Sequence, residues 1–260
     1  MDGAEDPKIT VPRRKGIQSI LTGFQVLDFL LKAGQAVPLR DIAAGTGLSA
    51  SKLQFYLISL AEVGAVKQDV QTGHYGLGAY TLRLGIAGLQ QFDIYQSAHA
   101  RMEQLAKDTG ATVFLGVWGD QGPTVIHRTE SPSRHPIFDL RLGAVLPITG
   151  SALGRLFLAY LPKSVTADHV IGGIASFEDS SRHIRQARLS ISRGELLAEH
   201  TAISAPIFDQ SGRILAGITL MGPQNLLSDD PDSAAARALK TLTETISHEA
   251  GATTQHYLDF

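Results

Sequence analysis

The stretch that decides the fold is Ala36–Leu60, which reads AVPLRDIAAGTGLSASKLQFYLISL. Pro38 stands where the first turn of a helix tolerates proline, and the short apolar pattern after it stops at residues 45–47, Gly-Thr-Gly. Ser49 or Ser51 can cap the next helix, because a serine hydroxyl accepts a hydrogen bond from a free amide of the first turn. That helix places on one face Leu53, Tyr56, Leu57 and Leu60. The pattern predicts two short helices that meet across a glycine turn.

The segments on either side complete a larger motif. Apolar residues recur with helical spacing from Ile17 to Leu31 and stop before Gly34, which predicts a helix with one buried face. After the quoted stretch, residues 65–69 and 74–77 read as two brief strands around a tight turn. Helix, helix, turn, helix and hairpin make a winged helix-turn-helix, whose third helix fits the major groove of DNA.

The distribution of charge supports an anionic partner for this N-terminal part. Residues 8–83 carry nine Lys or Arg against four Asp or Glu, a balance of +5, whereas residues 91–260 carry 14 against 18, a balance of −4. Basic side chains and small polar groups hold phosphates and base edges, so we expect double-stranded DNA as the partner. The residues expected to contact it are Arg13, Arg14, Lys15, Arg40, Ser49, Ser51, Lys52, Gln54 and His74.

A second interpretation of the winged helix stays open at this point. The unit would serve as a protein interface in a small-molecule-binding sensor or an enzyme. Salt-dependent binding to duplex DNA separates the two interpretations, because only DNA binding requires the neutralisation of phosphates.

A linker helix is predicted next, because residues 79–91 keep helical spacing despite Gly85 and Gly88. Its apolar side chains need a partner face, and one winged helix buries little DNA, so we expect a homodimer or dimer of dimers on a roughly palindromic operator. The expected organisation is a basic arm at 1–15, the winged helix at 16–78, the linker at 79–91 and a larger domain at 92–260.

The larger domain mixes short strands and helices in an order that predicts an α+β fold, with an antiparallel sheet covered by helices. A helix that ends at Thr109-Gly110 opens it. The predicted strands are 111–118, 124–129, 136–142, 201–208 and 213–221. The predicted helices are 151–161, 163–172, 181–190 and 233–249.

Several classes of function are disfavoured by composition and motif. The chain has no cysteine, which excludes disulfides and thiolate metal sites and fits a cytoplasmic protein. None of its nine histidines forms an HxxxH or HxH pair, so no metal site is expected. Nucleotide-binding fingerprints and nucleophile–base arrangements are absent from the sequence, so neither an enzyme nor a cofactor is expected. Polar residues interrupt the N-terminal apolar stretch, so we expect no signal peptide and no membrane span.

Five segments together resemble the IclR family of bacterial transcriptional regulators, over residues 16–250. They are the run 36–47, the helix 49–60, the wing 71–78, the block 150–155 (Gly-Ser-Ala-Leu-Gly-Arg) and the strand 203–209 with Gly212. The resemblance implies an N-terminal winged helix-turn-helix, a dimerising linker helix and a GAF-like C-terminal domain. That domain would bind a small effector, often a carboxylic acid, and dimers or tetramers would be usual.

The chain departs from the family pattern at four positions. Phe55 stands where the recognition helix commonly carries a basic residue, and Ala202 stands where members often have cysteine. Thr219 and Met221 stand at two positions where members often have serine. One expected consequence is a wider and less polar effector pocket.

An effector site is expected around the helix start at Gly150-Ser151-Ala152, because free amides at a helix start favour an anion. Ser151 could equally be an ordinary N-cap. Arg193 can grip a carboxylate with two parallel bonds, although a surface Arg paired with Glu195 is an equal alternative. The full expected set is Phe114, Trp118, Leu140, Thr149, Gly150, Ser151, Ala152, Ser192, Arg193, Ala202, Thr219 and Met221.

Overall fold

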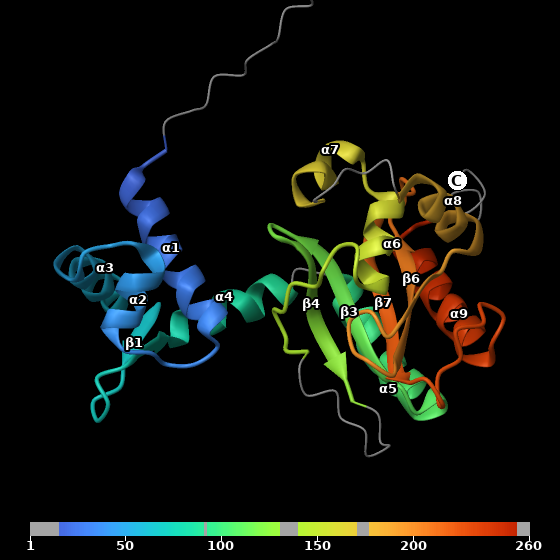
Figure 1. Cartoon of the computed structure of the whole chain (residues 1–260), viewed down its shortest axis with the longest axis horizontal. Helices are drawn as coiled ribbons and strands as arrows, with labels where there is room; N and C mark the ends of the chain where they lie inside the picture. Colours follow the sequence, from blue (N-terminus) through green and yellow to red (C-terminus); the bar gives the residue numbers. More distant parts are fainter. Residues whose placement is uncertain (1–15, 91–92, 131–139, 171–176, 254–260) are drawn as a thin grey trace, which may run out of the picture. The chain divides into compact units, whose positions relative to one another are not determined.

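The computed structural model describes residues 16–90, 93–130, 140–170 and 177–253 (Figure 1). The chain forms two compact units, residues 1–91 and residues 92–260. Within the part of the chain that the structure describes, no helix combines the length and the apolar character needed to cross a membrane.

The N-terminal unit is a winged helix-turn-helix followed by a further helix. Its elements are α1 (Gln18–Ala33), α2 (Leu39–Thr46), α3 (Ala50–Glu62), β1 (Val66–Gln68), β2 (Tyr75–Leu77) and α4 (Ala79–Gln90). The two strands pair antiparallel, with Lys67 opposite Gly76.

The ends of these helices follow the local chemistry of the sequence. Gly34 ends α1 with φ of 64°, and its amide donates to the carbonyls of Leu30 and Leu31. Gly47 ends α2 with φ of 69°, a left-handed conformation that glycine adopts without steric cost. Ser49 then caps α3. The core of the unit comprises Val26, Leu30, Ile42, Leu53, Leu57, Val66 and Tyr75.

The first helix differs from its sequence prediction. The predicted single buried face is wrong, because Ile17, Ile20, Leu21, Phe24 and Leu31 are each more than half exposed. The side buried in the unit carries Thr22, Gly23, Val26 and Leu30 instead. The apolar stripe is wider than the surface that α2, α3 and the hairpin can cover, so a second apolar face remains on α1.

The C-terminal unit is built on one antiparallel sheet with the strand order β4-β3-β7-β6-β5. Its strands are β3 (Thr112–Gly119), β4 (Gly122–Thr129), β5 (Ser190–Arg193), β6 (His200–Phe208) and β7 (Ile214–Pro223). Its helices are α5 (Asp93–Thr109), α6 (Ala152–Tyr160), α7 (Lys163–Thr166), the 3-10 turn η1 (Ala167–His169), α8 (Glu178–Ala187) and α9 (Ala234–Glu249).

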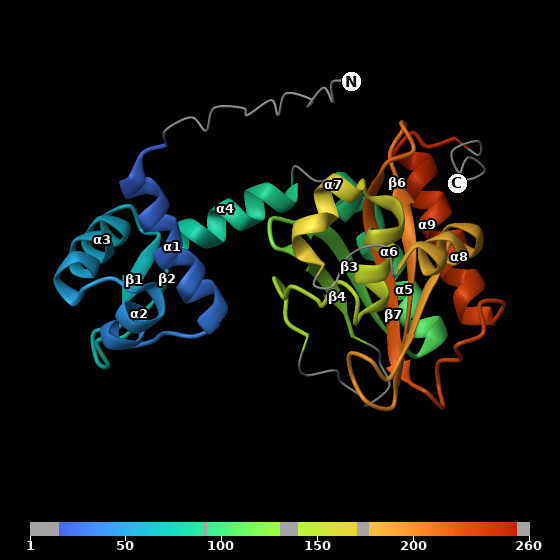
Figure 2. The same cartoon turned by 45° about the horizontal axis from the view of Figure 1, so that its top comes forward.

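Helices cover both faces of this sheet, so it has two apolar cores (Figure 2). On one face α5 and α9 pack against strand residues such as Leu115 and Ile218. On the other face α6 and α8 pack against Phe114 and Phe208. The α+β fold predicted from the sequence, with its winged helix, linker helix and antiparallel sheet, is confirmed.

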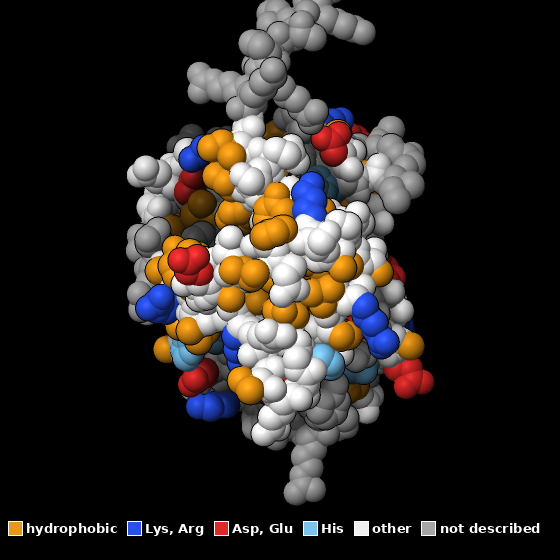
Figure 3. Space-filling view, turned by 90° about the vertical axis from the view of Figure 1, so that its left-hand side faces the viewer, with side chains coloured by type: hydrophobic (Ala, Val, Ile, Leu, Met, Phe, Trp, Pro, Cys, Tyr) orange, Lys and Arg blue, Asp and Glu red, His pale blue; other side chains and the backbone are white. Residues whose placement is uncertain are grey.

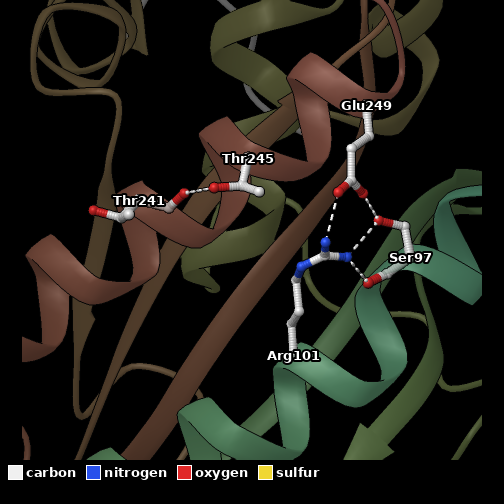
Figure 4. A network of polar contacts seen from close by, with 5 residues as sticks. All are labelled: Ser97, Arg101, Thr241, Thr245 and Glu249. Atoms are coloured by element: carbon white, nitrogen blue, oxygen red, sulfur yellow. Dashed lines mark hydrogen bonds and ion pairs between the residues drawn. The ribbon is translucent and has the colours of Figure 1, made fainter.

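A polar network ties α5 to α9 at the surface (Figure 4). The Arg101 guanidinium donates to the Ser97 carbonyl at 2.7 Å and to Glu249 Oε1 at 2.5 Å, and the Ser97 hydroxyl donates to the same carboxylate. Because both charged side chains are about 40% exposed, the ion pair contributes at most about 1 kcal/mol.

Three predicted elements are corrected by the structure. Residues 136–139 of the predicted strand 136–142 lie outside the described residues, and residues 140–142 are not in a strand. The helix predicted at 181–190 ends at Ala187, because Arg188 turns left-handed with φ of 55° and Ser190 already belongs to β5. The helix predicted at 163–172 ends at Thr166 and continues only as the 3-10 turn to His169.

Candidate DNA-binding surface and effector cavity

The exposed side of α3 is the candidate DNA-binding surface. Leu53 and Leu57 are buried against the core, so the predicted contact residues Ser51, Lys52 and Gln54 lie on the exposed part of the helix. Figure 3 shows the side of the chain on which α3 lies in Figure 1; hydrophobic side chains cross the middle of this face, with a few Lys and Arg around them.

The remaining predicted contacts are dispersed over this unit. Arg40 on α2 is 86% exposed in its side chain and lies 3.2 Å from Asp41, a surface ion pair that opens at little cost. His74 is half-buried just before β2. The three arm residues, Arg13, Arg14 and Lys15, lie outside the described residues.

The turn of the wing carries a carboxylate that the backbone holds in its charged form. Asp69 Oδ1 accepts hydrogen bonds from the Thr72 amide at 2.7 Å, the Thr72 hydroxyl at 2.9 Å and the Gln71 amide at 3.0 Å. These bonds, those from Thr72 first, hold the pKa of Asp69 below its ordinary value. A phosphate is therefore disfavoured at the turn itself.

The described winged helix is close to neutral. Residues 16–90 contain five basic side chains (Lys32, Arg40, Lys52, Lys67 and Arg83) and four acidic ones (Asp28, Asp41, Glu62 and Asp69), which leaves +1. Of the balance of +5 over residues 8–83, +4 therefore belongs to residues 8–15, whereas the segment 1–15 as a whole carries +1 because of Asp2, Glu5 and Asp6.

The C-terminal unit contains a small cavity between its sheet and the start of α6. It is lined by Phe114, Leu140, Leu146, Ser151, Ala152, Leu153, Leu196, Ala202, Thr219 and Met221. Seven of these belong to the predicted effector set, and Leu146, Leu153 and Leu196 were missed. Leucine is the commonest core residue, so nothing in the sequence distinguishes these three from ordinary packing.

The cavity volume is about 10 Å³, space for about one water molecule. The expectation of a wider pocket stays a prediction, and the long side chain of Met221 is part of the cavity wall. The described lining carries no charged side chain.

The hydroxyl of Ser151 acts as a helix cap. It accepts a hydrogen bond from the Gly154 amide at 3.0 Å and donates one to the Pro147 carbonyl at 2.7 Å. Thr149 and Gly150 precede this cap and do not line the cavity, although the Thr149 carbonyl accepts a hydrogen bond from Arg155.

Arg193 lies away from the cavity, which corrects the role expected for it. Its side chain is 61% exposed and lies 3.2 Å from both Gln224 Oε1 and Asp229 Oδ2. Strand side chains alternate between faces, and the neighbouring Ser192 is the buried one, opposite Ala202. Glu195, the alternative partner, pairs with Arg155.

Two more expected members of the pocket do not line it. Trp118 stacks edge-on against Phe157 at 5.7 Å and against His169 at 5.3 Å, measured between ring centroids, so it belongs to the packing around α6. Ser192 is buried but is not part of the described lining.

A cation that the sequence reasoning missed lies beside the cavity. Arg128 on β4 is the cross-strand neighbour of Phe114, with its guanidinium 6.0 Å from that ring, and its Nη1 donates to the Leu140 carbonyl at 2.8 Å. Its Nη2 lies 2.9 Å from Glu130 Oε1. Arg128 Nε is buried and has no hydrogen-bond partner among the described residues. A single Arg in a short strand gives no sequence signal for such a role.

The polar groups of the cavity wall extend along one row of the sheet. Thr219 is paired with Phe114 on one side and with Ser204 on the other, and the Ser204 and Thr219 hydroxyls are 2.7 Å apart. Both residues are buried, and each hydroxyl finds its hydrogen-bond partner in the other.

Two family models match the chain, and they correspond to its two units. "IclR helix-turn-helix domain" matches residues 19–70. "Bacterial transcriptional regulator IclR C-terminal" matches residues 86–248.

Individual relatives match about nine-tenths of the chain. The glycerol operon regulatory protein of Streptomyces coelicolor is 28% identical over 92% of this chain and 98% of its own. The crystal structure of Pseudomonas aeruginosa HmgR is 32% identical over 92% of this chain and 100% of that one, with a TM-score of 0.58.

A more distant structure shares the fold. The IclR homologue from Microbacterium hydrocarbonoxydans, solved with 4-hydroxybenzoate, is 17% identical over 90% of this chain and 100% of that one, with a TM-score of 0.77. With both halves matched by models of transcriptional regulators rather than enzymes, this chain belongs to the IclR family of bacterial transcriptional regulators.

Proposed function

We propose that this regulator acts in the cytoplasm as a homodimer or dimer of dimers on a roughly palindromic operator, and that a small organic acid changes its operator affinity. The observation that supports DNA binding is α3, the second helix of a helix-turn-helix, whose predicted contact residues are exposed opposite its buried side.

Exposed apolar surfaces among the described residues of the N-terminal unit support the dimer. One is the outer face of α1, defined above, and the other is α4, where Tyr80, Leu82, Leu84 and Ile86 are 40–65% exposed. Apolar patches of this kind on a small unit mark a protein interface. A second copy is the occupant we propose, since two half-sites are needed for specific affinity.

An acid as the effector is supported by the pairing of an apolar cavity with Arg128. The Microbacterium homologue was solved with 4-hydroxybenzoate, a carboxylic acid. In this chain a carboxylate would bind the free Nε and the adjacent Nη2 of Arg128 and would displace Glu130, while Phe114 and Leu140 would contact the apolar part.

The cavity is smaller than the proposed ligand, so ligand binding and a change of structure are linked. Space for about one water cannot admit an organic acid, so binding must open the region around Met221 and α6. A ligand that favours an opened state shifts the population toward it, and a coupling to DNA affinity of about 1–3 kcal/mol is typical.

DNA binding is tested by the salt dependence of affinity for duplexes from the promoter region beside the chain's own gene. We expect log Kd to rise linearly with log salt concentration, and Lys52→Ala to lower this slope by about one because one phosphate contact is lost. Sedimentation of the complex should show two or four protomers. Salt-independent binding, or a monomer on and off DNA, would contradict the proposal.

The acid site is tested by calorimetry with 4-hydroxybenzoate and other small aromatic and aliphatic acids, each beside its neutral amide. We expect Arg128→Met to weaken binding of the acid about 10–100-fold, since a hydrogen bond to a charged group contributes about 1.5–3 kcal/mol. The amide should be little affected. Arg193→Met is the matched control and should bind the acid with normal affinity. A loss of acid affinity in Arg193→Met alone would show that Arg128 is not the residue that binds the carboxylate.

A further inference from the structure

The centre of the exposed side of α3 is apolar. A helical period places Ser51, Phe55, Ile58 and Glu62 in one line on the side opposite Leu53 and Leu57. In this line Phe55 is 73% exposed and Ile58 is 56% exposed. Two large apolar side chains thus lie on the side of α3 that would face DNA.

The hydroxyl groups near these side chains are engaged within the protein. The Ser49 hydroxyl accepts from the Lys52 amide at 3.4 Å and lies 3.4 Å from the Ser51 hydroxyl. The Ser59 hydroxyl donates to the Phe55 carbonyl at 3.1 Å. On this part of α3 the longer polar side chains, Lys52 and Gln54, flank the apolar line without belonging to it.

The acid at the end of the line indicates which half of α3 enters the groove. Glu62 lies in the last turn and repels phosphates, whereas the N-terminal turn presents free amides and a positive dipole end. The N-terminal half, which carries base contacts in helix-turn-helix proteins, includes Phe55.

Phe55 can meet only one kind of group on the base edges of the major groove. Base pairs present hydrogen-bond donors and acceptors there, together with the C5 methyl of thymine. A phenyl ring placed against these donors or acceptors would displace the water bound to them without forming hydrogen bonds in its place, which is unfavourable. We propose, on the basis of the DNA-binding function proposed above, that Phe55 determines specificity by packing against a thymine methyl in each half-site, with Ile58 beside it.

The experiment uses the full chain and duplexes that it selects from a random pool. Each thymine of the best duplex is replaced singly by deoxyuridine, which removes only the methyl group. At one position per half-site we expect an affinity loss of about fourfold, the value of one buried methyl, and about 15-fold when both half-sites are changed. Phe55→Ala should weaken binding to the thymine duplex and abolish its difference from the deoxyuridine duplex.

Two further variants separate recognition from folding. Phe55→Arg should shift the selected base at that position from thymine to guanine, the partner of arginine in the major groove. Leu142→Ala, an exposed leucine of the C-terminal unit, should leave the selection unchanged. Because Phe55 is exposed, neither of its substitutions should alter the unfolding transition.

Distinct outcomes overturn the proposal. If every thymine of the selected duplex can be replaced by deoxyuridine with less than a twofold change in affinity, the protein still binds DNA but Phe55 does not read a thymine methyl. A deoxyuridine effect that persists in Phe55→Ala, or a change of oligomeric state without a change of base preference, would lead to the same conclusion. If no duplex is selected, the DNA-binding function and this inference fail together.

Discussion

Replacing Leu57 with alanine should remove most of the stability of the N-terminal unit. Leu57 is 1% exposed and packs in a core of only a few large side chains. A buried Leu→Ala change costs about 2–5 kcal/mol through lost burial and the cavity left behind. Small domains have little stability in reserve, so we expect the melting temperature of this unit to fall by at least about 10 °C.

Thermal unfolding followed by circular dichroism, with DNA affinity measured at several temperatures, checks this expectation. Operator binding should be lost at temperatures where the wild-type protein still binds, while effector binding by the C-terminal unit persists. Ile58→Ala, one position along the same helix and 56% exposed, is the control for stability and should change it by less than about 0.5 kcal/mol. Equal stability of the two variants would show that α3 is not held by this core.

Gly154→Ala should distort the effector cavity and destabilise the C-terminal unit. A Cβ at this position would lie 2.3 Å from the Ile148 carbonyl oxygen and 2.6 Å from its Cα. These are backbone atoms, so no side-chain rotation relieves the clash, and α6 must move away from residues 146–151. Overpacking costs about 1–3 kcal/mol, and separating the Gly154 amide from the Ser151 cap adds about 0.5–2 kcal/mol.

Denaturant unfolding and calorimetry with the acids named above test both parts of this expectation. Gly150→Ala is the matched control, because its Cβ would meet only the Pro147 Cβ, at 3.4 Å. The control should fold and bind the acid nearly as wild type does. Normal acid binding by Gly154→Ala would mean that the start of α6 does not form the binding site.

The residues that shape the turns of the winged helix act locally, and for this reason they could be recognised from the sequence. Gly34 and Gly47 end helices because they adopt left-handed conformations freely, and Ser49 begins one because its hydroxyl reaches a free amide. The order of short strands with helices before and after them likewise predicted an antiparallel sheet covered by helices.

The sequence alone thus determined most of the elements, the fold class and the family resemblance. The tertiary structure decided which of two similar arginines lies beside the cavity: Arg128 borders it through Phe114 and Leu140, whereas Arg193 points to Gln224 and Asp229. It also decided which apolar face of α1 is buried. The place of an arginine beside the cavity and the choice of buried helix face depend on strand register and on packing between segments far apart in the chain. The local periodicity of a sequence shows only which residues share a face of a helix or strand.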